Sequence, residues 1–263
     1  MKDCHVQSTF TDKNYDSLDK IAAGAKAKGI DEITVTELLE FVDGNPSYAF
    51  SWHKLGVKRA SDSTIFDFNV GVEFSLEPDI YDKIVRVSRD RGLDYACAST
   101  NKIEGKKISD SSYFVGKNKG DLYRKYFEHV LRNVEEYKDC FDAYAKLDQI
   151  IRYGNDKRFN YDDYADLIDA ILEVLVKNDK GLEVCTLMSN DNNPLPMPYM
   201  TILRRYKDLG GKIITLGSGV SKADDLGKYF DYACDVIEAS GFNEIATYHR
   251  RIPDFEKVKS LRR

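Results

Sequence analysis

Short runs rich in β-branched residues alternate along the chain with longer segments whose apolar residues recur every three or four positions. The short runs predict strands, and the longer segments predict amphipathic helices. Strands are expected at residues 3–7, 32–36, 66–74, 94–99, 141–145, 182–186 and 212–216, with a last short strand at 244–248. The most periodic helix carries an apolar stripe of Tyr123, Tyr126, Phe127, Val130, Val134 and Tyr137, which predicts core packing.

Seven or eight strand-then-helix units follow one another without a linker. Units of this kind favour a closed parallel α/β barrel in one domain over residues 1–263, with a doubly wound open sheet as the alternative. Functional residues of such a barrel lie at the carboxyl ends of its strands.

Residues 44–64 show only a weak pattern and predict a surface excursion that carries His53. His129 and His249 are also expected on the surface.

Acidic and basic residues nearly balance, with 39 Lys and Arg against 44 Asp and Glu and a formal net charge of -5. A charge of this sign does not favour nucleic acid or an anionic membrane, so neither is an expected partner.

The five cysteines lack the short paired spacings of a zinc site and predict reduced thiols in the cytoplasm. No apolar run approaches the roughly 20 residues of a membrane-spanning helix, so we expect a soluble cytoplasmic protein.

The end of the first strand carries His5 and Gln7 on either side of Val6. Alternate side chains of a strand share a face, so a His-x-His pair at this spacing can bind one metal ion. Gln7 offers only a neutral amide, which is a poor ligand for a transition metal. The other strand ends place polar residues within 36–38, 71–73, 99–101, 146–148, 186–187 and 217–221.

Taken in order, these strand ends resemble the polymerase and histidinol phosphatase (PHP) superfamily, and specifically its monofunctional histidinol-phosphatase branch. The resemblance covers essentially the whole chain and rests on short fragments that include Asp3-Cys4-His5-Val6, Gly71-Val72-Glu73, Arg152-Tyr153-Gly154 and Leu209-Gly210-Gly211-Lys212. It implies a distorted TIM-like (β/α)7 barrel with three zinc, iron or manganese ions. In that family the ions bind the substrate phosphate and activate a water for hydrolysis of L-histidinol phosphate, a step of histidine biosynthesis.

The metal ligands that the resemblance implies are largely replaced in this chain. Ligand-type residues remain at His5, Glu37 and Glu73, whereas the other positions hold Gln7, Leu38, Asn101, Lys146, Gly219 and Ser221. Leu38 and Gly219 offer no side-chain ligand, and Lys146 brings an ammonium group to a place where a cation would sit. We therefore expect no three-metal cluster and at most one weakly bound ion. Arg152 matches an arginine that family members use on the phosphate.

The replaced residues compensate one another in charge. Without metal ions, Glu37 and Glu73 are costly to bury unpaired, and Lys146 would supply the missing positive charge in an ion pair with Glu73. A reactive Lys146 amine with a lowered pKa is the alternative, although nearby carboxylates would raise that pKa.

The resemblance and the replacements together predict a histidinol-phosphatase-like protein that is impaired or inactive as an enzyme. Two alternatives stay open. The first is a residual phosphoesterase that works on a small phosphorylated metabolite with one metal or none. The second is a non-catalytic module in which Arg152 and Lys146 hold inorganic phosphate or a phosphorylated metabolite.

Overall fold

A single parallel sheet forms the centre of the protein, whose computed structural model describes residues 1–42, 44–64, 66–154 and 158–262. Its seven strands lie in the order β1 (Lys2–Val6), β2 (Glu32–Leu39), β5 (Asp67–Ser75), β6 (Tyr95–Ser99), β9 (Ala143–Tyr144), β10 (Gly181–Cys185) and β11 (Ile214–Gly217). Every pair of neighbours in this sheet is parallel. The strand order follows the chain order, as expected for successive strand–helix units.

The sheet curls until its last strand meets its first. Beyond β11, Val220 bridges Val6 in parallel, and the amide of Gly219 donates to the carbonyl of His5 at 2.7 Å. Gly217 permits this approach, because a Cβ atom there would lie only 2.5 Å from the Cβ of His5. The expected (β/α)7 barrel is therefore confirmed, and the open-sheet alternative is wrong.

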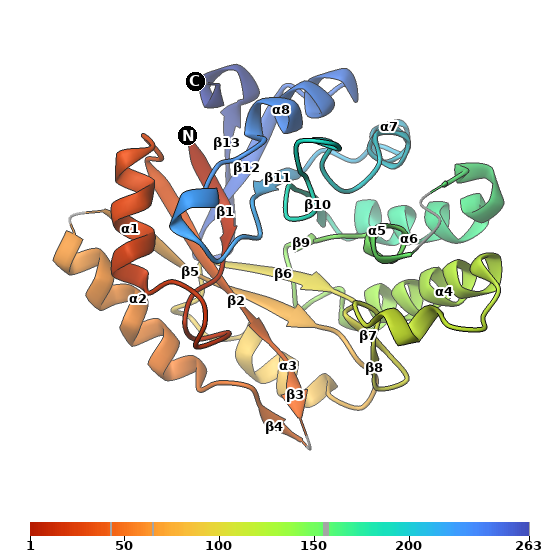
Figure 1. The fold of residues 1–263 in the computed structure, drawn as a ribbon, viewed down its shortest axis with the longest axis horizontal. Coiled ribbons are helices and arrows are strands. Elements are labelled where there is room, and N and C mark those ends of the chain that lie inside the picture. The colour runs from red at the N-terminus through yellow and green to blue at the C-terminus, as the bar shows by residue number, and fades with distance from the viewer. Residues whose placement is uncertain (43, 65, 155–157, 263) are drawn as a thin grey trace.

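Helices surround the sheet, with α1 and α2 on one side and α4 and α6 on the other (Figure 1). They are α1 (Leu18–Ala27), α2 (Phe50–Thr64), α3 (Tyr81–Ser88), α4 (Lys119–Tyr137), α5 (Gln149–Tyr153), α6 (Ala165–Lys177), α7 (Met200–Asp208) and α8 (Phe230–Ala239). The apolar stripe of α4 is buried, as its periodicity predicts. Within the described ranges, none of these helices has both the length and the apolar character to cross a membrane.

Short elements fill the connections. They are the two-stranded pieces β3 (Phe41–Val42) with β4 (Asn45–Pro46) and β7 (Lys102–Ile103) with β8 (Lys106–Lys107), and the 3-10 helices η1 (Ser111–Phe114), η2 (Tyr161–Tyr164), η3 (Ala223–Asp225) and η4 (Val258–Leu261).

The amino-terminal end of the barrel is covered by an antiparallel hairpin of β12 (Glu244–His249) and β13 (Ile252–Lys257). Ala246 and Tyr248 of β12 pack with Tyr95 and Cys97 of β6. At the hairpin turn, Arg251 binds Asp142 just before β9, with Nε 2.5 Å from Oδ2. The expected strand at 244–248 therefore exists but does not continue the parallel series. With this end covered, the carboxyl ends of the strands are left for a site.

Two expectations for lone histidines are wrong. Residues 50–64 form helix α2 rather than a surface excursion, and His53 on it is fully buried beside the rings of Phe10 and Tyr48. The buried positions His53, Val57 and Ala60 have helical spacing, but a histidine, which counts as polar, hides the period. His129 on α4 is buried as well, whereas His249 is half exposed as expected.

We predict that Arg251→Ala lowers the free energy of unfolding by about 2–3 kcal/mol. The Asp142 carboxyl is buried and would lose its cation, although the 21% exposure of the Arg251 side chain reduces the cost below that of a fully buried pair. Urea unfolding measures the change. Arg250→Ala is the matched control, because Arg250 is exposed and shares the positive φ of Arg251, and it should change stability by less than about 0.5 kcal/mol. Equal losses of stability in both variants would contradict the role of the Arg251–Asp142 ion pair in holding the hairpin against the barrel.

Candidate functional site

Four charged side chains from four different strands or strand ends meet inside the barrel. The Nζ atom of Lys146 lies 2.5 Å from Oε1 of Glu73, and Nε2 of His5 lies 3.0 Å from Oε2 of the same carboxylate. On its other side, Nδ1 of His5 lies 2.8 Å from Oε1 of Glu183. We refer to Lys146, Glu73, His5 and Glu183 as the ion chain. His5, Glu73 and Glu183 are 0% exposed and Lys146 is 5% exposed.

Three members of the ion chain, Lys146, Glu73 and His5, are kept in their charged forms by their partners. Burial alone would raise the pKa of Glu73, but Lys146 and His5 bring that pKa well below its usual range. Burial also opposes the charge on His5, yet Glu183 raises the pKa of the imidazole well above its usual value. Burial opposes and Glu73 favours the ammonium of Lys146, and the net pKa is raised. Lys146 therefore stays protonated, which counts against a reactive amine.

Two positions expected to have lost a metal ligand now donate to Glu73. The amide of Gln7 lies 3.2 Å from its Oε2, and the amide of Asn101 lies 3.4 Å from its Oε1. Ser99 adds a hydroxyl donor at 2.5 Å from Oε1. The Glu73 carboxylate is thus surrounded by donors from several strand ends, as a buried charge requires.

Glu37 lies in a separate polar cage. Its fully buried carboxylate accepts the backbone amides of Ser8 and Thr11 at 3.0 and 3.1 Å, the hydroxyl of Thr11 at 2.5 Å, and the hydroxyl of Ser8. Burial raises the pKa of Glu37 in spite of these bonds. The amide of the neighbouring Leu38 donates to Thr11 Oγ1 at 3.0 Å, and its carbonyl accepts from the hydroxyl of Ser47 at 3.4 Å. Glu37 therefore fixes the loop after β1 and is not joined to the ion chain by a described contact.

The strand end after β11 has no room for a larger side chain at Gly219. This residue has a φ of +66°, and a Cβ atom there would lie 3.0 Å from both Cys185 Sγ and Leu187 Cβ. An aspartate at that position would meet backbone strain and two tight contacts. Ser221, two residues on, accepts the amide of Asp16 through its carbonyl at 3.0 Å. The backbone conformation at this position therefore favours a glycine over a residue whose side chain could bind a metal.

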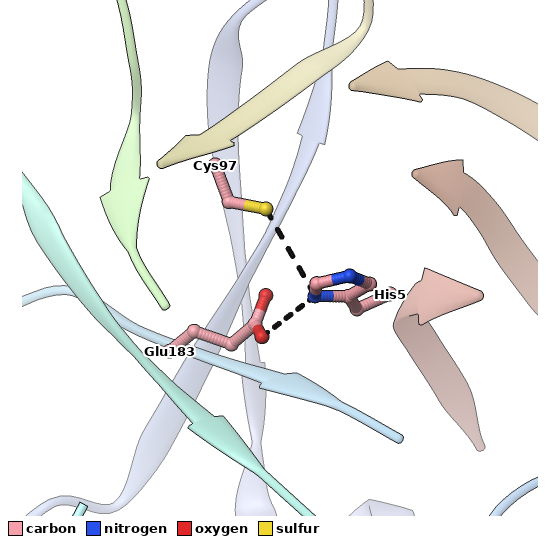
Figure 2. A group of neighbouring side chains, drawn as sticks. All are labelled: His5, Cys97 and Glu183. Carbon is pink, nitrogen blue, oxygen red and sulfur yellow. Dashed lines mark hydrogen bonds and ion pairs between the residues drawn. The ribbon is translucent and has the colours of Figure 1, made fainter. Parts of the chain in front are cut away.

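One group in the described part of the chain could hold a metal ion. The donor atoms of His5, Cys97 and Glu183 lie within 4.8 Å of one another. Figure 2 shows the three side chains pointing toward one another. Nitrogen, sulfur and oxygen donors of this kind suit zinc. Burial raises the pKa of the Cys97 thiol to about 12, so the thiol is protonated without a metal. Three donors can serve one ion, and the residues present do not fit a cluster of three.

Sequence reasoning missed Glu183 and Cys97, because both lie within strands rather than at strand ends. The available signal was the isolated acid in Leu182-Glu183-Val184, since a charge in a buried strand requires a partner.

Arg152, which the resemblance predicts to bind a phosphate, makes its contacts away from the ion chain. Its Nη2 atom donates to the carbonyl of Pro196 at 2.9 Å, and its guanidinium stacks on the ring of Tyr199 at 4.6 Å. No described contact joins Arg152 to Lys146 or Glu73.

A model of the PHP domain matches residues 3–186. The chain belongs to the PHP family. Curated PHP relatives include a histidinol-phosphatase of Lactococcus lactis subsp. lactis, 26% identical over 94% of this chain and 93% of that protein, and a probable histidinol-phosphatase of Thermotoga maritima, 25% identical over 96% and 97%.

Two solved structures share the fold of this chain. A histidinol phosphate phosphatase of L. lactis, in complex with zinc, L-histidinol and phosphate, aligns with a TM-score of 0.85 at 24% identity, over 96% of this chain and 98% of that one. A hypothesised histidinol phosphatase of Listeria monocytogenes aligns with a TM-score of 0.69 at 15% identity, over 88% and 99%. At these identities the likeness establishes the fold.

We predict that Lys146→Met lowers the free energy of unfolding by about 3–5 kcal/mol, because it leaves the buried Glu73 without one of its two cations. Chemical denaturation measures the loss. The double variant with Glu73→Gln should recover part of it, since both charges are then removed.

Lys125→Met is the matched control for this change. Lys125 and Glu104 form a pair at 2.7 Å, but their side chains are 47% and 71% exposed, so the loss should stay near 0–1 kcal/mol. A Lys146→Met protein as stable as Lys125→Met would contradict the ion chain.

Proposed function

We propose that this PHP protein does not assemble a trinuclear metal cluster and does not hydrolyse L-histidinol phosphate. Instead of catalysing a reaction, the mouth of the barrel binds a small phosphorylated metabolite or inorganic phosphate. The observation that carries the proposal is the ion chain, in which both ring nitrogens of His5 bind carboxylates and Lys146 binds Glu73.

Charge balance is the physical reason. A metal cluster neutralises buried carboxylates with dications, and here Lys146 and protonated His5 neutralise Glu73 and Glu183 instead. A dication held by Glu73 would lie beside the Lys146 ammonium. At about 4 Å and an effective dielectric constant of about 20, these charges repel by roughly 8 kcal/mol. His5 could bind that ion only by giving up a proton and a hydrogen bond.

The group of His5, Cys97 and Glu183 does not support the alternative of a one-metal phosphoesterase. All three side chains are 0% exposed. A catalytic ion needs an open coordination position where water and the substrate phosphate can meet. An ion in this buried group would therefore be structural.

A cavity of about 230 Å³ beside the ends of β10 and β11 supports the binding role. Its lining includes Thr186, Ser189, Ser221, Lys222 and Lys228. Lys228 lies 3.8 Å from Asp225 and is only loosely compensated, whereas Lys222 lies 3.4 Å from Asp16 and donates to the carbonyl of Asn14 at 2.6 Å. Hydroxyl and ammonium donors in a small recess suit a phosphate group.

We predict binding without turnover. Titration calorimetry with L-histidinol phosphate should give heat that falls in Lys228→Met, while no phosphate is released in the presence of Mn²⁺ or Zn²⁺. The L. lactis histidinol-phosphatase serves as the positive control for release. Lys177→Met, on the outer face of α6, is the control for loss of a surface lysine. Elemental analysis after dialysis should find less than one metal ion per chain.

Two results would overturn this function. The first is phosphate release that disappears in Glu73→Gln. The second is a preparation that retains two or more zinc, iron or manganese ions per chain.

A further inference from the structure

The outer side of helix α2 carries two large apolar side chains and two cations that solvent reaches. Trp52 is 64% exposed and Leu55 is 37% exposed. Lys58 and Arg59 are exposed as well, and neither forms an ion pair with any residue that the structure describes. Figure 1 places α2 at the periphery of the molecule. Tryptophan is highly buried on average and is enriched in protein interfaces, so its exposure here marks a candidate contact surface.

These four residues lie on one side of the helix. With 3.6 residues per turn, Trp52, Leu55 and Arg59 follow one line along α2, and Lys58 lies beside that line. The buried residues of α2 lie on the opposite side, against the barrel. We refer to Trp52, Leu55, Lys58 and Arg59 as the α2 face.

The α2 face is complementary to itself. Trp52 precedes Leu55 by three residues, and Lys58 and Arg59 follow Leu55 by three and four residues. When two copies of the helix lie antiparallel with their Leu55 side chains in contact, Trp52 of each copy lies beside Lys58 and Arg59 of the other. Tryptophan is the aromatic side chain that best attracts a cation to its ring, and arginine is the cation found there most often.

Charge decides the orientation of the two helices. In a parallel pair, the Arg59 side chains of the two copies would face each other, and facing like charges oppose association. In the antiparallel pair, eight residues separate the two Arg59 positions, which is about 12 Å along the helix axis. This separation exceeds the screening length of about 8 Å at physiological ionic strength.

We propose that the α2 face is the contact surface of a homodimer with two-fold symmetry, in which the α2 helices of two copies pack antiparallel around Leu55. The occupant is a second copy of this chain, because one helix supplies both the aromatic and the cationic half of the contact, as a two-fold interface requires. The face is only about 10 Å long, so the dimer is weak and forms between micromolar and millimolar chain concentration. The proposal does not depend on the function proposed for the barrel mouth.

Trp52 is the single tryptophan of the chain and reports on the α2 face directly. Front-face fluorescence of the full, unmodified chain should move to shorter wavelength as its concentration rises from micromolar to millimolar, because Trp52 leaves water. Sedimentation equilibrium over the same range should show conversion of monomer to dimer. This pair of measurements needs no variant and is therefore unaffected by folding defects.

Two variants test the arrangement of the dimer. Leu55→Asp should stay monomeric throughout the range, because it places two carboxylates at the two-fold axis. Arg59→Ser should weaken dimerisation at least about fivefold, since the symmetry repeats each lost contact with Trp52. The matched controls are Val115→Asp, at a 75% exposed valine between η1 and α4, and Arg250→Ser, at the exposed turn of the β12–β13 hairpin. Both should dimerise like the unmodified protein.

Four results would each overturn the proposal. They are a monomer throughout the concentration range, a dimer in which the Trp52 emission does not shift, a dimer that persists in Leu55→Asp, and a dimer whose affinity Arg59→Ser leaves unchanged.

Discussion

Glu73 is a fully buried carboxylate with two cations bound to its two oxygens, and the interior of the barrel is arranged around it. A lone charge at this depth would be too costly to keep. Lys146 compensates Glu73 from one side and His5 from the other. Glu183 then balances the positive charge that His5 adds. With His5 protonated, the four groups sum to zero. The charges buried inside the barrel are thus compensated by the protein's own side chains.

The fold supplies the geometry that the ion chain needs. Each member comes from a different strand or strand end, and parallel strands of a closed barrel bring those ends together. Closure itself depends on Gly217, which lets β11 approach His5, and the hairpin that Arg251 binds covers the opposite end. The same closure leaves Gly219 without space for a longer side chain. The backbone conformation at Gly219 therefore disfavours any side chain that could act as a ligand there.

Much of this arrangement could be predicted from the sequence, because buried parallel strands read as short apolar runs and their ends carry the chemistry. The pairing of Lys146 with Glu73 followed from charge balance once the resemblance had placed both residues at the barrel mouth. Glu183 could not be identified as a partner of His5, because strand order and barrel closure decide which buried groups meet. Helix α2 was missed because His53 occupies a core position, and the direction of β12 was missed because apolar content does not distinguish parallel from antiparallel pairing.

The protonation state of His5 tests the ion chain most directly. Correlation of the ring protons with both ring nitrogens in the ¹⁵N-labelled protein distinguishes an imidazolium from either neutral tautomer, and His5→Gln assigns the signal among the four histidines. At pH 8, we predict that both nitrogens of His5 are protonated and stay so when Zn²⁺ or Mn²⁺ is added. A neutral His5, or a nitrogen that loses its proton to a bound metal, would contradict the central claim.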